Sequence, residues 1–184
     1  MVDALRARGD EVIVADKDVV DLTDGEAVEA FWDALEASPR WVANVAGGFR
    51  PGTVADSEPE DVRLLTELNL GTAWWSCRAA ARRLPEGGAI VNVAARAGVG
   101  PTGGTGSAAY AVAKAGVIRL TQVLALELAE RRVRVNAVAP ALIETPANRA
   151  AGTTGGTKPE AVAATIAFLL SDDASAVTGA VVPV

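Results

Sequence analysis

The sequence predicts one α/β domain over residues 1–184, built on a doubly wound parallel sheet. Short β-branched runs alternate along the chain with segments of helical periodicity, which is the order of repeated strand–helix units. Most of the strand-like runs are apolar throughout, as expected of parallel strands that helices cover on both faces. A chain of 184 residues that is 50% hydrophobic is long enough to bury a core of this kind.

Five runs rich in valine are predicted to form the strands: 11–16, 40–46, 89–94, 133–139 and 179–184.

The segments between these runs carry the helices, predicted over residues 25–37, 57–84, 107–130 and 158–171. Pro159 stands at the start of the last of these, where a first helical turn tolerates proline. The Gly- and Thr-rich stretch 140–157 is predicted to be a mobile loop beside a site.

Composition excludes several classes of partner. The net charge is −6 and no block of Lys or Arg occurs, which argues against nucleic acid and anionic membrane surfaces. No apolar run looks long enough to span a bilayer, and the first ten residues do not resemble a signal peptide. Cys77 is the single cysteine, so no internal disulfide framework exists and a cytoplasmic location is expected.

Metal chemistry is not expected either. The chain has no histidine and one cysteine, so a zinc or copper site would have to be built almost entirely from carboxylates.

A glycine-rich stretch after the run 89–94 matches the pattern G-x-G-x-x-G at Gly98, Gly100 and Gly103. In a phosphate-binding loop the glycines lead directly from a strand into a helix. Here "TGSAA" intervenes before the helix, and Pro101 removes one amide donor. We therefore interpret the stretch as an active-site loop and not as a phosphate cradle.

Tyr110 and Lys114 form the chemically strongest pair. A spacing of four residues places both side chains on one face of a helix. A nearby ammonium stabilises a phenolate and lowers the pKa of the phenol, so such a pair can exchange a proton with a carbonyl or alcohol oxygen. The alternative is an interfacial aromatic residue next to a solvated charge.

Six segments of the sequence, one of which contains Tyr110 and Lys114, decide between these interpretations. In chain order they are "NVAGG" from Asn44, "ELNLGTA" around Asn69, "GGAIVNV", "YAVAK" from Tyr110, "VRVNAVAPALIETP" and "SDDASAVTGAVVPV". With these motifs in this order, the chain resembles the short-chain dehydrogenase/reductase family over essentially its whole length.

The resemblance implies a Rossmann-type sheet that binds a nicotinamide dinucleotide and supports hydride transfer to or from a carbonyl or alcohol. Tyr110 would be the general acid/base. Lys114 would lower its pKa and hold the nicotinamide ribose, and Asn69 would anchor a water in a proton relay. Asn69 could also be a helix-interior amide bonded to a neighbouring strand.

The resemblance also places cofactor contacts. Asn44, Ala46 and Gly47 would pass beside the cofactor, with the glycine allowing close backbone approach. Ile143 and Thr145 would contact the carboxamide, although Thr145 could equally be a turn residue.

Asp16 ends the run 11–16, where the family carries an acidic residue that binds the adenosine ribose. A carboxylate there repels a 2′-phosphate, so NAD(H) is preferred, while the adjacent Lys17 keeps NADP(H) possible. Asp16 could also be a turn residue at the end of a strand. Asp21 and Leu22 match the segment that lies along the adenine.

The chain departs from the family pattern at Ala95, which stands where the family carries its catalytic serine. Loss of one preorganised donor typically costs on the order of a hundredfold in rate. Ser107 is a possible substitute, but its position favours the N-cap of the following helix. A smaller departure is Ala141, where the family usually has glycine.

One branch of the family, the dihydropteridine reductases, shares the alanine and resembles the chain at "VAGGF" and "TPANR". That likeness implies a pterin-like substrate reduced with NADH. A general keto-reductase with an altered site is the alternative.

The chain opens in what resembles the helix before the family's second strand, so the first strand and its glycine-rich loop have no counterpart. We therefore expect an N-terminally truncated member. The alternative function is a non-catalytic binding or oligomerisation module. The resemblance implies a homodimer or homotetramer paired through the two long helices, to which Trp74 and Trp75 could contribute unless they pack on their own sheet.

Overall fold

The computed structural model describes residues 1–100, 104–150, 152 and 155–184, apart from the side chain of residue 147. Its centre is a four-stranded parallel sheet in the order β1-β2-β3-β4. The strands are β1 (Trp41–Asn44), β2 (Ala89–Val93), β3 (Arg134–Ala139) and β4 (Val181–Pro183). The predicted α/β class and four of the five predicted strands are thereby confirmed.

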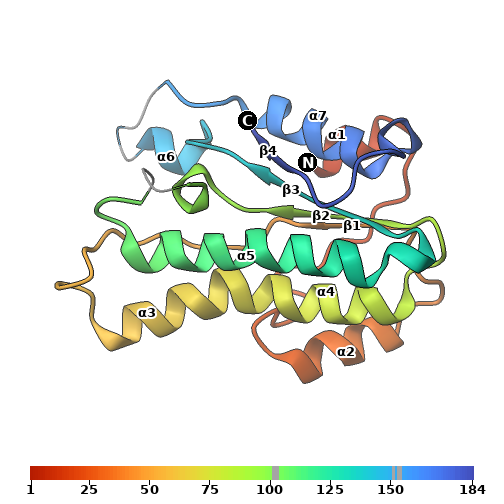
Figure 1. Cartoon of the computed structure of the whole chain (residues 1–184), viewed down its shortest axis with the longest axis horizontal. Coiled ribbons are helices and arrows are strands. Elements are labelled where there is room, and N and C mark those ends of the chain that lie inside the picture. Colours follow the sequence, from red (N-terminus) through yellow and green to blue (C-terminus); the bar gives the residue numbers. More distant parts are fainter. Residues whose placement is uncertain (101–103, 151, 153–154) are drawn as a thin grey trace.

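Helices cover both faces of the sheet (Figure 1). One face carries α2 (Gly25–Asp33), α3 (Pro59–Thr66), α4 (Thr72–Arg83) and α5 (Ala108–Glu127). The other face carries α1 (Val2–Arg6) and α7 (Pro159–Leu170).

Shorter helical elements connect these helices and strands. They are the π-helical turn η1 (Glu67–Gly71), which joins α3 to α4, the helix α6 (Pro146–Ala150), and the 3₁₀ turns η2 (Arg96–Gly98), η3 (Ala129–Arg131) and η4 (Asp172–Ala174).

The prediction of a strand at 11–16 was wrong. These residues form no ladder with any described strand, and Ile13 and Val14 leave 52% and 40% of their surface exposed. The apolar pattern of the run indicates that it can be buried, but a strand also needs a neighbour for its backbone groups. No described strand pairs with this run.

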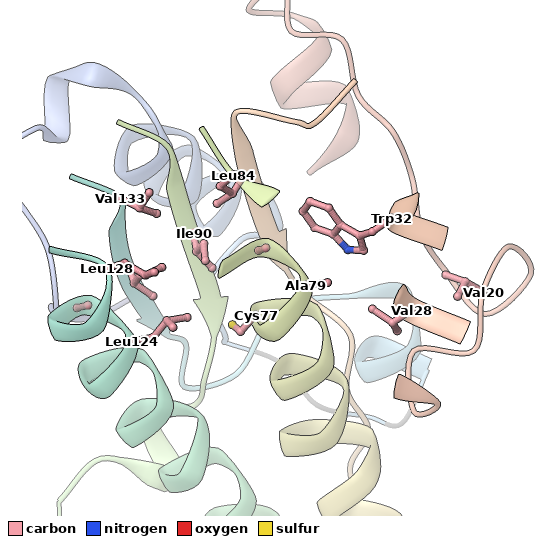
Figure 2. Close-up of a cluster of buried hydrophobic side chains, with 13 residues drawn as sticks. Val20, Val28, Trp32, Cys77, Ala79, Leu84, Ile90, Leu124, Leu128 and Val133 are labelled. Atoms are coloured by element: carbon pink, nitrogen blue, oxygen red, sulfur yellow. The ribbon is translucent and has the colours of Figure 1, made fainter. Parts of the chain in front are cut away.

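The larger core lies between the sheet and the helices α2, α4 and α5. Figure 2 shows Leu124 of α5 and Cys77 of α4 close to Ile90 of the sheet, and Val28 of α2 on the side of α4 that carries Ala79. On the opposite face Ile166 and the other apolar residues of α7 pack against β2 and β3. Because β2 and β3 are covered on both sides, their apolar runs follow the pattern expected of them.

A chain of buried hydrogen bonds ties this sheet to α4 and α5. The Asn92 amide donates to Thr121 Oγ1 at 2.9 Å, and the Asn44 amide donates to Asn92 Oδ1 at 2.8 Å. Ser76 Oγ donates to Asn44 Oδ1 at 2.6 Å, while Cys77 lies beside both asparagines. Burial raises the pKa of the Cys77 thiol to about 12, so this sulfur is a neutral packing group.

The carboxyl end of α7 is held by a buried arginine on β3. The guanidinium of Arg134 donates to the backbone carbonyls of Leu169 at 2.6 Å, Leu170 at 3.0 Å and Ser171 at 2.9 Å. These carbonyls lack partners within the helix, and a cation near them is favourable. Burial lowers the pKa of Arg134.

The expectation that no segment is long and apolar enough to cross a membrane was wrong for α5. By length and composition alone, α5 meets that criterion, and core helices that pack on a sheet meet it as well. Ala113, Val117 and Leu124 bury one face of α5.

Thr121→Val is expected to lower the free energy of unfolding by about 1–3 kcal/mol, because the buried Asn92 amide loses its acceptor. Thr165→Val is the matched control, since Thr165 also donates to the carbonyl four residues earlier, but this bond is exposed and the residue is only partly buried. Urea denaturation of both variants measures the difference. Equal losses would show that the Asn92 bond contributes nothing to stability.

Candidate active site

The site lies at the carboxyl ends of the strands, where α5 begins and α6 lies (Figure 1). Parallel α/β sheets place ligands at this edge because all strands end there. The structure brings Gly47, Asn69, Tyr110 and Lys114 together at this edge, from three different parts of the chain.

Lys114 is the centre of this group. Its Nζ donates to the backbone carbonyl of Val93 at 2.7 Å, and the residue is only 4% exposed. Burial lowers the pKa of Lys114 to about 8. A Cβ at Gly47 would lie 3.3 Å from Nζ and 2.6 Å from Asn69 Oδ1, so the close approach of this loop requires glycine.

Tyr110 lies one turn earlier on α5. The Lys114 Nζ is 5.9 Å from the centre of the Tyr110 ring, which confirms that the two side chains share a face. Burial raises the pKa of the Tyr110 phenol, so the expected lowering by Lys114 is not what the structure shows. Desolvation disfavours the charged phenolate here.

Asn69 is buried within the π-helical turn η1. Its Nδ2 donates to the carbonyls of Gly48 and Leu65, both at 2.9 Å, and its Oδ1 accepts from the Gly48 amide at 3.2 Å. Asn69 is thus a bonded helix-interior amide, as in the alternative role, but its partners are α3 and the loop after β1 and not a strand. Single π-helical turns are frequent at functional sites.

The residues at the end of β1 and directly after it divide into two groups. The Asn44 side chain is occupied by Ser76 and Asn92, so it points into the structure and only its backbone is left for a ligand. Ala46 and Gly47 are exposed at the edge of the sheet.

Thr145 and Ile143 follow β3. Thr145 Oγ1 accepts from the Asn148 amide at 3.1 Å and so caps α6, which is the turn role considered from the sequence. Ile143 pairs with Thr157 in an isolated parallel bridge and packs toward the core under α7. The prediction of a loop over residues 140–157 was wrong at 146–150, because these residues form the helix α6. Residues 151, 153 and 154 lie outside the described part of the chain.

The three residues assigned to the adenosine make local contacts. Asp16 is exposed, and its Oδ1 accepts from the Asp18 amide at 3.1 Å, as in a turn. Asp21 Oδ1 accepts from the amide and the hydroxyl of Thr23, and these bonds lower the pKa of Asp21. Leu22 packs against the larger core.

Ala95 is buried with 4% of its surface exposed, directly after β2, and it offers no donor to a substrate oxygen. Ser107 occupies the N-cap position of α5 as predicted, but its hydroxyl donates to the Gly104 carbonyl at 3.3 Å and caps no amide.

Close packing against α5 explains why residue 98 is a glycine. A Cβ on Gly98 would lie 2.6 Å from the backbone nitrogen of Ala115, so the loop can approach the helix only as glycine. This contact supports the interpretation of an active-site loop. Pro101 and Gly103 lie outside the described residues.

Phe49 was not assigned to the site from the sequence. Its ring meets the ring of Tyr110 edge to face, with centroids 5.2 Å apart and planes at 82°. The signal for it was an aromatic residue in the loop after β1. In the described part of the chain, no cluster of three or more His, Cys, Asp or Glu residues could hold a metal ion.

Comparison with known proteins agrees with this arrangement. A family model described as enoyl-(acyl carrier protein) reductase matches residues 2–184. The meso-2,3-butanediol dehydrogenase of Serratia marcescens is 33% identical over 181 residues, which are 90% of this chain and 71% of that enzyme. The galactitol 2-dehydrogenase of Rhizobium johnstonii is 38% identical over 202 residues, covering 98% and 77% of the two chains.

Solved structures agree as well. A short-chain type dehydrogenase/reductase from Mycobacterium ulcerans superimposes with a TM-score of 0.82 at 30% identity, covering 90% of this chain and 66% of that one. A 4-hydroxyisoleucine dehydrogenase complexed with NADH gives a TM-score of 0.78 at 26% identity, covering 90% and 77%.

A parallel sheet with its reactive groups at the carboxyl ends, together with these relatives, defines an α/β oxidoreductase of the Rossmann type. The chain belongs to the short-chain dehydrogenase/reductase family, whose members are nicotinamide-dependent.

The depressed pKa of Lys114 predicts how stability changes with pH. Its pKa is about 8 in the folded chain against 10.5 when exposed, so between these values the unfolded chain binds more protons. The free energy of unfolding should therefore rise with pH across this window, by about 3 kcal/mol in all.

Lys114→Met should remove this rise and increase stability at neutral pH, which urea denaturation at several pH values measures. Lys17→Met is the control, because Lys17 is exposed. Parallel pH curves for the original chain and Lys114→Met would contradict the prediction.

Proposed function

We propose that the chain transfers hydride between a nicotinamide dinucleotide and a small carbonyl or alcohol substrate, with Tyr110 as the acid/base. One observation carries the proposal. The nearly buried ammonium of Lys114 lies close to the backbone of Gly47 and one helical turn from the Tyr110 phenol.

The described residues fit the nicotinamide half of such a cofactor. An ammonium has three N–H donors, and Lys114 gives one of them to Val93, so others remain for ribose hydroxyls. Gly47 lets the backbone of its loop lie close to Lys114, since a Cβ there would be 3.3 Å from Nζ. Ile143 and Thr145 border the same edge after β3. When bound, the dinucleotide supplies or accepts the hydride.

The described residues hold no glycine turn that leads from a strand directly into a helix, which is the usual cradle for the pyrophosphate. Gly98 does not supply one, because it packs against the backbone of α5.

The protonic half of the reaction is assigned to α5. The Tyr110 hydroxyl donates a proton to the carbonyl oxygen during reduction and accepts it back during oxidation. The Lys114 ammonium, on the same face, stabilises the phenolate that this leaves. Because burial raises the pKa of Tyr110, the phenol keeps its proton until an acceptor arrives.

NAD(H) is the preferred cofactor in this proposal. The carboxylate of Asp16 is exposed at the turn after residues 11–15 and would repel a 2′-phosphate. NADP(H) stays possible because Lys17 follows it. One structural relative was solved with NADH.

The substrate is proposed to be a ketone or alcohol, or a pterin-like ring. The relatives named for butanediol and galactitol favour the alcohols. The buried Ala95, which offers no hydroxyl, favours a substrate that needs less polarisation of its oxygen. We also propose a cytoplasmic location, in keeping with the single buried thiol of Cys77.

A second candidate function is a non-catalytic module that pairs with further copies of the chain as a homodimer or homotetramer. Trp74 of α4 is 50% exposed beside a hollow of about 330 Å³ that Leu70 and Trp75 also line. Val112 and Leu126 of α5 are 72% and 77% exposed. Apolar groups gathered on long helices often mark an interface. Trp75 packs partly against the core of its own chain, which is the alternative role considered from the sequence.

Calorimetric titration is expected to show that NADH binds more tightly than NADPH. Tyr110→Phe should keep this binding and lose at least a hundredfold of the NADH-dependent reduction of a vicinal diketone, because the proton donor is gone. Full turnover by Tyr110→Phe would refute the assigned acid/base. A chain that binds neither nucleotide but sediments as a dimer would favour the second candidate.

Ala95→Ser separates the substrate classes. It should raise kcat/KM for ketones by about a hundredfold, because the new hydroxyl supplies the missing donor at the end of β2. Reduction of a quinonoid dihydropterin should change little. A gain with the pterin and none with ketones would contradict this assignment.

A further inference from the structure

We propose that Phe49 is a positioning residue for Tyr110, held in place by its loop so that its ring orients the phenol and shields it from water. The proposal rests on the role given to Tyr110 above. The two rings meet edge to face, with centroids 5.2 Å apart and planes at 82°, although they come from different elements. Offset and edge-to-face pairs are the favoured geometries for aromatic side chains.

The loop that carries Phe49, residues 45–52, is fixed on both sides of it. On one side, Gly48 exchanges two hydrogen bonds with the Asn69 side chain. On the other, the Gly52 amide donates to the Gly106 carbonyl at 2.8 Å, and the Ala108 amide donates to the Gly52 carbonyl at 2.9 Å. Phe49 is therefore placed by backbone bonds to η1 and to the start of α5.

Two glycines allow this loop to lie close to η1. A Cβ on Gly47 would lie 2.6 Å from Asn69 Oδ1, and one on Gly48 would lie 3.0 Å from Leu68 Cδ1. The π-helical turn thus fixes Asn69, Asn69 fixes the loop, and the loop sets Phe49 against Tyr110.

Core formation does not explain this position of Phe49, since 62% of its surface is exposed. The part that is covered includes the edge-to-face contact with the only tyrosine of the chain. A ring there restricts rotation of the Tyr110 side chain and removes water from one side of the phenol, in agreement with the raised pKa of Tyr110.

The elements that contact α5 also carry charged groups. Lys114 is on the same helix, Arg96 is in η2, and Arg50 follows Phe49 and pairs with Asp61 of α3. All four are unchanged in the variants below, so a shift in the titration of Tyr110 reports the ring of Phe49.

Because Tyr110 is the only tyrosine, phenolate absorbance and the ring signals of tyrosine-labelled protein each report this residue alone. In Phe49→Leu we expect the phenolic pKa to fall toward its ordinary value and the ring-current shift of the Tyr110 signals to disappear. Phe49→Trp should retain both features, because it restores an aromatic edge. Phe168→Leu, at a 47% exposed phenylalanine on α7, is the matched control and should change neither.

Thermal melting by circular dichroism checks that each variant folds, and Phe49→Met serves as a second aliphatic variant if Phe49→Leu does not. An aliphatic variant that folds and leaves the titration and the ring signals of Tyr110 unchanged would overturn the proposal. Neither measurement needs nucleotide or turnover, so failure of the oxidoreductase function would appear separately, as absence of NADH binding.

Discussion

Burial of the Lys114 ammonium against the carbonyl of Val93 is the contact around which the site is built. A charged group this far from water is costly, and the cost is met only if α5 lies close to the end of β2. Two glycines allow α5 to pack closely against η2 and η1. A Cβ at Gly98 would collide with the backbone of α5, and one at Gly116 would lie 2.9 Å from Leu70 Cδ2. Lysine, loop and helix therefore form one packed unit.

Most of the fold could be predicted from the sequence because the apolar pattern of each strand and helix is visible within a short segment. The strands β2 and β3 are apolar at nearly every position, which follows from burial on both faces. The run 11–16 carries the same pattern, yet it forms no strand in the described structure, because a ladder depends on a neighbour that no local pattern reveals. The helix α6 was missed, although Thr145 before Pro146 is a recognisable helix start.

The sequence predicted which residues form the candidate site better than it predicted their pKa shifts and contacts. The spacing of Tyr110 and Lys114 placed them on one face, as the structure shows. The direction of the Tyr110 pKa was wrong, because spacing says nothing of how deeply a phenol is buried. The π-helical turn at Asn69 and the aromatic contact of Phe49 arise from packing between distant segments, so only the family likeness pointed to either region.

The outer edge of β1 bears on how the chain behaves in concentrated solution. Residues 41–44 pair with β2 on one side, and on the other side no described strand covers their backbone groups. Charged residues or proline often protect such an edge, and Trp41, Val42, Ala43 and Asn44 include neither. Pairing through the exposed faces of α4 and α5 can close on itself as a symmetric pair, whereas pairing at a strand edge can recruit any extended chain. The two modes therefore differ in whether association stops at a defined size.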